Sequence, residues 1–210
     1  MRVIIKKGGM MPHKEAYFGE VIESSLTGFV VQSWEWDHAP LFGSLVMIRE
    51  RDCILFGVVH QIVIGSIDTI RTPFAYRKTH EELKREQPHI FEFLRTTCAC
   101  VIVGYRSGRS LLYMMAPNPP NIHSFVSPIT PELAQQFFSC PDYLYVLQAS
   151  NGSISHFDEL LLALIAQSMQ QGYLDERGLR LFMNTYVLIA GNEYRRIKLF
   201  ARRIQHIVTL

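Results

Sequence analysis

The first half of the chain alternates short apolar, β-branched runs with glycine and polar turns. The runs lie at Gly19–Ser24, Gly28–Ser33, Leu45–Arg49, Cys53–Ile64, Cys98–Tyr105 and Ser110–Met115. Runs of this length and composition are typical of β-strands, and the connection around Thr27 is short enough for a hairpin. Gly57, inside the fourth run, predicts a bulge or a sharp bend. Several short strands with such bends predict a small β-barrel.

A helical segment interrupts the predicted strands near residues 79–95. Thr79 and Glu82 are spaced as a capping box, in which each side chain binds the other residue's backbone N–H. Pro88 ends or kinks this helix and can open a second short helix, His89–Arg95. We therefore expect the two strands that follow the insertion to complete the barrel.

A proline-rich stretch separates the predicted barrel from the rest of the chain. Residues Asn118–Pro128 contain three prolines. Because proline has no backbone N–H, we expect neither a helix nor a central strand here, but a linker or an extended arm. Thr130 and Pro131 then have the pattern of a cap and a first helical residue, which predicts a short helix ending near Ser139.

The last part of the chain changes to helical periodicity. Apolar residues recur at helical spacing at Leu160, Leu161, Leu164, Ile165 and Met169, and again at Leu179, Phe182, Met183, Tyr186 and Ile189. The expected limits of three helices are Ser155, with Asp158 as a capping partner, to Gly172, Asp175 to Gly191, and Asn192 onward. Three successive helices predict a small bundle.

These patterns together predict an α+β protein with an N-terminal small β-barrel and a C-terminal helical bundle. The expected divisions are a flexible leader at 1–15, a barrel domain at 16–116, the proline-rich arm with its short helix at 117–141, and a helical domain at 142–210. With 210 residues, the chain is long enough to bury a hydrophobic core.

Composition and charge narrow the class of protein. Hydrophobic residues make up 48% of the chain and charged residues 19%, which excludes a disordered, collagen-like or long coiled-coil protein. The formal charge of +2 is too small to require a polyanionic partner. The cysteines form no CxxC pair, and no apolar window reaches the length of a membrane span. We expect a soluble, cytoplasmic protein without membrane contact.

No motif for nucleotide binding or catalysis is present in the sequence. The GxxxxGK[ST], strand-linked GxGxxG and GxSxG patterns are all missing, so we expect no nucleotide and no enzyme. Cys98 and Cys100 share one face of a predicted strand, but without a nearby second ligand pair they fit core residues better than a zinc site. His60 lies in an apolar run and fits a core or edge histidine better than a base. No metal or cofactor is predicted.

Both tryptophans lie at the end of the second predicted strand, in Trp34-Glu35-Trp36-Asp37-His38. Their alternate positions would place Trp34 and Trp36 on one face of a strand, where two such rings could anchor a partner protein. A second interpretation is that both rings simply fill the end of the barrel.

The last predicted helix carries a stripe of five cations. They are Arg195, Arg196, Lys198, Arg202 and Arg203. Clustered guanidinium groups bind phosphates or carboxylates, so the stripe could contact nucleic acid or an acidic protein. The other interpretation is an ordinary solvated helix face, whose cations complement the helix dipole.

The stretch Phe18–Val63 resembles the HAS-barrel, the N-terminal barrel of HerA-like DNA translocases and of the catalytic subunits of rotary ATP synthases. The matching segments are Gly19–Val21, Gly28–Val31, Gly43–Val46 and Ile54–Val58. In that family the barrel precedes an ATPase core with a P-loop, which this sequence lacks. The resemblance therefore implies only the barrel's role, which is to gather subunits into a ring and to dock partners.

The sequence as a whole predicts a non-enzymatic protein-interaction or assembly module, such as a ring-forming or adaptor subunit. Its partner would be another protein or further copies of itself, bound at barrel edges or at the tryptophan end. The alternative is a nucleic-acid-binding protein that uses the basic helix and the barrel surface.

Overall fold

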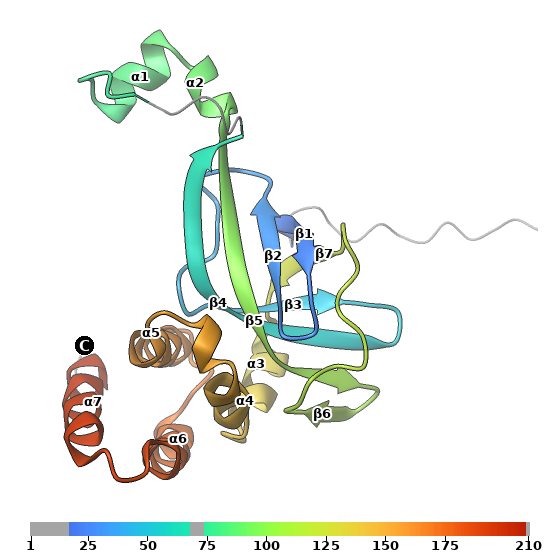
Figure 1. Cartoon of the computed structure of the whole chain (residues 1–210), viewed down its shortest axis with the longest axis vertical. Coiled ribbons are helices and arrows are strands. Elements are labelled where there is room, and N and C mark those ends of the chain that lie inside the picture. Colours follow the sequence, from blue (N-terminus) through green and yellow to red (C-terminus); the bar gives the residue numbers. More distant parts are fainter. Residues whose placement is uncertain (1–16, 68–73, 209–210) are drawn as a thin grey trace, which may run out of the picture.

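Six antiparallel strands close into a barrel in the computed structural model, which describes residues 17–67 and 74–208. Their order is β2 (Gly28–Ser33), β1 (Gly19–Ser24), β7 (Phe125–Pro128), β3 (Leu45–Arg49), β4 (Cys53–Ser66) and β5 (Leu94–Ser107) (Figure 1). Pairing of β2 with β5 closes the ring, so each of these six strands has a paired neighbour on both sides within the ring. The short β6 (Ser110–Leu112) pairs with β5 outside the ring. The prediction of an α+β protein with a barrel is confirmed.

The predicted bend at Gly57 is confirmed as a break in the register between β4 and β5. Pairing shifts between Phe56 and Gly57, and again between Val59 and Gln61. A Cβ atom built on Gly57 would lie 2.7 Å from Cζ of Phe29, whose ring fills the barrel interior. Glycine therefore lets β4 bend around a packed core.

The expectation of no central strand between Asn118 and Pro128 is wrong. Strand β7 occupies the end of that segment and pairs on both sides, Gly19 with Val126 and Met47 with Ser127. Two of the three prolines precede the strand and Pro128 is its last residue, so the residues between them keep their backbone donors. The segment thus supplies the strand that closes the barrel.

The helical insertion lies at the far end of a long hairpin. Helix α1 (His80–Glu86) has the predicted capping box between Thr79 and Glu82. Helix α2 (His89–Glu92) is shorter than predicted, because Leu94 already pairs with Ser66 as the first residue of β5. Strands β4 and β5 each have 14 residues and extend beyond the barrel to carry both helices (Figure 1).

The remaining helices follow β7. They are α3 (Pro131–Phe138), α4 (Tyr143–Ala149), the 3-10 turn η2 (Asn151–Ser153), α5 (Phe157–Gln170), α6 (Glu176–Ala190) and α7 (Tyr194–Val208). Pro131 opens α3 as predicted, but the side chain of Thr130 forms no capping bond. His156, not Ser155, precedes α5. Helix α4 is not predicted by the sequence patterns.

The predicted limits of α6 are confirmed. The carboxylate of Asp175 accepts a 2.7 Å hydrogen bond from the backbone N–H of Gly178. Gly191 ends the helix with a φ of +58°, a conformation that favours glycine. None of the helices in the described ranges is long and apolar enough to cross a lipid bilayer.

Two hydrophobic cores result from this arrangement. One fills the barrel with alternate residues of its strands, among them Val31, Ile48 and Val126. The other lies between the barrel and helices α3 to α7, and there Phe56 and Val103 meet the helical side chains. We call the outward side of β3, β4 and β5, on which these helices pack, the covered wall. We call the outward side of β1, β2 and the start of β7 the open wall.

Candidate interaction surfaces

The two tryptophans do not share a face, because the chain bends after β2 ends at Ser33. Trp34 stays on the open wall with 43% of its surface exposed. Its indole Nε1 donates a 3.0 Å hydrogen bond to Oε1 of Glu20 on β1. Its ring meets that of Phe125 edge to face, with 5.4 Å between centroids.

Trp36 turns the other way and packs within the molecule. Its ring stacks on Phe91 of the helical insertion at 5.7 Å and lies at the same distance from His80. Its backbone carbonyl accepts a hydrogen bond from the hydroxyl of Thr96, so the loop is also attached to β5. Trp36 therefore joins the insertion to the end of the barrel, and Trp34 is the tryptophan left available to a partner.

Trp34 belongs to a surface that we call the aromatic patch, formed by Tyr17, Trp34 and Phe125 together with Glu20 and His123. The rings of Tyr17 and Phe125 lie 5.4 Å apart, and Phe125 is 47% exposed. Nδ1 of His123 lies 3.2 Å from Oε2 of Glu20, so this carboxylate contacts both the indole and the imidazole. Sequence reasoning missed Phe125 and His123, because both lie in the proline-rich segment.

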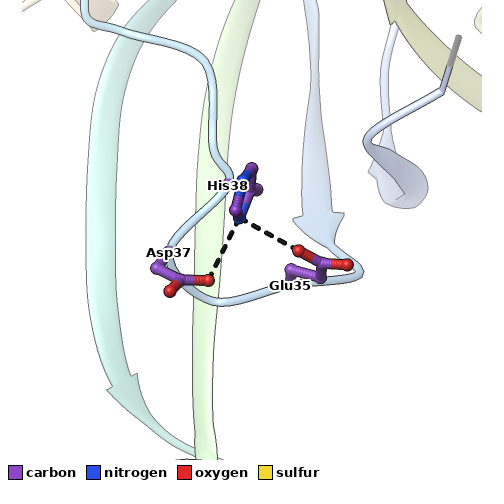
Figure 2. Close-up of side chains that lie close together, drawn as sticks. All are labelled: Glu35, Asp37 and His38. Atoms are coloured by element: carbon purple, nitrogen blue, oxygen red, sulfur yellow. Dashed lines mark hydrogen bonds and ion pairs between the residues drawn. The ribbon is translucent and has the colours of Figure 1, made fainter. Parts of the chain in front are cut away.

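A cluster of polar groups follows Trp34 in the same loop (Figure 2). Nδ1 of His38 lies 3.0 Å from a carboxylate oxygen of Glu35 and 3.2 Å from one of Asp37. The hydrogen bond with His38 holds the pKa of Asp37 below its ordinary value.

The same three side chains are the one group among the described residues whose ligand atoms lie close enough to hold a metal ion, within 4.8 Å of one another. All three are exposed, and a single histidine nitrogen already serves both carboxylates. We therefore interpret the cluster as ion pairs that order the loop, and assign no metal to it.

Two of the five cations on α7 are held by carboxylates at the start of α5. Nε and Nη2 of Arg196 lie 2.8 and 2.6 Å from the two oxygens of Asp158. The hydroxyl of Tyr186 donates to the same carboxylate at 3.2 Å. Arg203 likewise binds Glu159 through both terminal nitrogens, which lowers the pKa of that carboxyl. These two arginines attach α7 to α5.

The other three cations form a basic face, which we define as Arg195, Lys198 and Arg202. All three are exposed. Their spacing of three and four residues places them on one side of α7. The structure shows no ion pair between them and any other residue it describes. Leu199 lies beside them with 55% of its surface exposed.

The remaining sequence candidates are interior or partly buried. Cys98 and Cys100 line the inside of the barrel, as expected for small core residues. Burial raises the pKa of the Cys98 thiol to about 11, so little thiolate forms at neutral pH. His60 lies half-buried at the second register shift of β4, and burial lowers its pKa.

Comparison with known proteins returns no match, either to a family model or to a curated protein. Function is therefore inferred from the aromatic patch and the basic face.

Proposed function

We propose that this chain is a non-enzymatic protein-interaction module and that the aromatic patch is its docking surface. One observation supports this most directly: Trp34 and Phe125 touch each other on the open wall, yet each keeps more than two-fifths of its surface exposed. Aromatic side chains contribute most to binding hot spots, and adjacent exposed ones mark interaction sites.

The surroundings of Trp34 hold its ring ready for binding. Glu20 accepts the indole N–H on one carboxylate oxygen and contacts His123 through the other. Trp34 also packs edge to face on Phe125, which limits its rotation further. A side chain that is already positioned loses little conformational entropy when a partner binds, so more of the contact energy appears as affinity.

The role of an adaptor or ring-forming subunit agrees with this proposal. Helices cover one wall of the closed barrel, and no described helix packs on the wall that carries the aromatic patch, which leaves one broad surface for a partner. The HAS-barrel resemblance implies the same docking role. The four cysteines have no disulfide partner, which agrees with a location in the cytoplasm.

Nucleic-acid binding by the barrel surface has less support. The open wall and its following loop carry Glu20, Glu23 and Glu35, whose charge repels phosphate. Two of the five cations on α7 are also paired with carboxylates. A protein partner therefore fits the open wall better than a nucleic acid.

The test uses a photo-reactive benzoylphenylalanine placed at position 34 of the full chain, in the cells that make it. The matched control carries the same residue at Tyr145 on α4, an aromatic residue that is 50% exposed. We expect a discrete covalent protein adduct from position 34 and none from position 145. Phe125→Ala, introduced into the first chain, should reduce the adduct severalfold. The same adducts from both positions, or none from position 34, would contradict the proposal.

A further inference from the structure

We infer that the occupant of the aromatic patch is the basic face of α7 on a second copy of this chain. The inference rests on the proposed function, since it takes the aromatic patch as a docking surface and names what docks there. Its starting point is that the molecule has two complementary surfaces, an acidic one with exposed aromatic rings and a basic one whose cations form no ion pair with the other described residues.

The open wall and the loop that follows Trp34 carry acidic side chains, of which Glu20 contacts Trp34 directly. Glu20 and Glu23 lie on β1, and Glu35 and Asp37 lie in the loop after β2. The ion pairs described for these carboxylates are all with histidines, His38 and His123. No described lysine or arginine forms an ion pair with these carboxylates, although the charge of Lys84 helps to lower the pKa of Asp37. The patch therefore keeps negative charge next to exposed aromatic rings.

The basic face has the chemistry that such a patch binds. A guanidinium group stacks on an aromatic ring and can also donate paired hydrogen bonds to a carboxylate. Arg195 and Arg202 are both exposed, while their neighbours Arg196 and Arg203 are held by α5. Leu199 adds an exposed apolar side chain beside them. One arginine against Trp34 would thus meet both a π-face and the carboxylate of Glu20.

The two surfaces cannot meet within one chain. Helix α7 lies on the outer side of the helical layer, and the open wall with β1, β2 and β7 lies on the other side of the barrel (Figure 1). A contact between the basic face and the aromatic patch must therefore join two copies. Because the two surfaces lie on opposite sides of the molecule (Figure 1), two copies cannot exchange both contacts with each other, so the contact is head to tail and its repetition gives a closed ring or an open chain.

The experiment is analytical ultracentrifugation of the purified full chain over a range of concentrations. We expect association that strengthens with concentration and weakens as salt rises, because salt screens exposed charges. The charge reversal Arg195→Glu with Arg202→Glu should weaken association at least tenfold, and so should Trp34→Ala. The matched control, Arg177→Glu with Arg180→Glu, reverses two exposed arginines on α6 and should associate like the wild-type chain.

Mixing the two weakened variants gives the sharpest test. The Trp34→Ala chain keeps its basic face, and the Arg195→Glu, Arg202→Glu chain keeps its aromatic patch. Together they should form a one-to-one complex that grows no further, since each has a single working surface. A contact between two identical surfaces would not give this result. A common melting temperature for all variants shows that each one is folded.

Three outcomes would overturn the inference. They are a wild-type chain that stays monomeric at every concentration, unchanged association of the Arg195→Glu, Arg202→Glu variant, and no complex in the mixture. Salt-sensitive binding of a single-stranded oligonucleotide by monomeric protein, lost in the same arginine variant, would assign the basic face to nucleic acid instead. If position 34 still cross-links to another protein while the pure chain is monomeric, the proposed function stands and only the second copy is excluded.

Discussion

The covered wall and the open wall belong to one barrel but have opposite outward surfaces. On the covered wall, outward residues such as Met47, Phe56 and Val103 are at most 4% exposed, because helices pack on them. On the open wall, β1 presents Glu20 and Glu23 instead. Strands buried on both faces need apolar residues at every position, whereas one-sided strands alternate. The aromatic patch departs from that alternation, because Trp34 and Phe125 are exposed aromatic residues, and this is why we propose it as a docking surface.

We expect the largest loss of stability from a substitution in α3, which packs on the covered wall. Phe137 is fully buried and packs against Phe56 at 5.6 Å and Tyr143 at 4.9 Å. Phe137→Ala should lower the free energy of unfolding by about 4 kcal/mol, from lost apolar burial and the remaining cavity. Chemical denaturation measures this loss.

The matched substitution on the open wall is Phe125→Ala. Phe125 is nearly half exposed, so its removal should cost under about 1 kcal/mol. If Phe137→Ala and Phe125→Ala lowered the free energy of unfolding equally, the covered and open walls would not differ in packing as described.

A smaller loss of stability is expected at Gly43, which lies in close contact with helix α5. This residue has a φ of +83°, and a Cβ atom there would lie 2.7 Å from Cβ of Ala163 and 2.8 Å from the backbone nitrogen of Leu164 on α5. Gly43→Ala should cost about 3 kcal/mol, which combines the strain of a positive φ with overpacking.

Gly108 provides the control for this substitution. It has a φ of +58°, but a Cβ atom there would meet nothing within 4 Å. Gly108→Ala should therefore cost only the backbone strain, about 1 kcal/mol. Thermal unfolding of the two variants side by side separates the strain from the steric contact, and identical melting temperatures would argue against a tight contact between Gly43 and α5.

The smallest loss of stability is expected from the ion pair that attaches α7 to α5. Arg196→Ala leaves Asp158 without its paired donors, at a site where both side chains are about 30% exposed. Partial exposure limits the expected loss to about 1 kcal/mol. Arg195→Ala, one residue earlier, should change the free energy of unfolding by less than about 0.5 kcal/mol. Urea denaturation compares the two, and a larger loss from Arg195 would show that it is not a free surface cation.

Local signals in the sequence predicted much of the fold. The limits of β1, β2 and β3 match the structure residue for residue, because each run is bounded by turn residues. The capping box at Thr79 and the limits of α6 at Asp175 and Gly191 are confirmed for the same reason. In each case the physical cause lies within a few residues of the element.

The parts that sequence reasoning missed depend on contacts between distant residues. Strand β7 forms because β1 and β3 both need a partner, and no local pattern within Asn118–Pro128 reports that. The aromatic patch depends on the same pairing, since it brings His123 and Glu20 together across 103 positions. Which cations of α7 form ion pairs depends on where α5 places the carboxylates of Asp158 and Glu159.

The position of β7 in the sequence also affects how the chain folds as it is made. Strands β1 and β3 are synthesised early, but the strand that joins them ends at Pro128. Until that residue has left the ribosome, the growing chain holds an open sheet with two unpaired edges, a form that readily pairs with other chains. The ring can close only after the whole β4–β5 hairpin, including α1 and α2, has been produced. Closing so long a loop makes this a late folding step, during which protection from aggregation matters most.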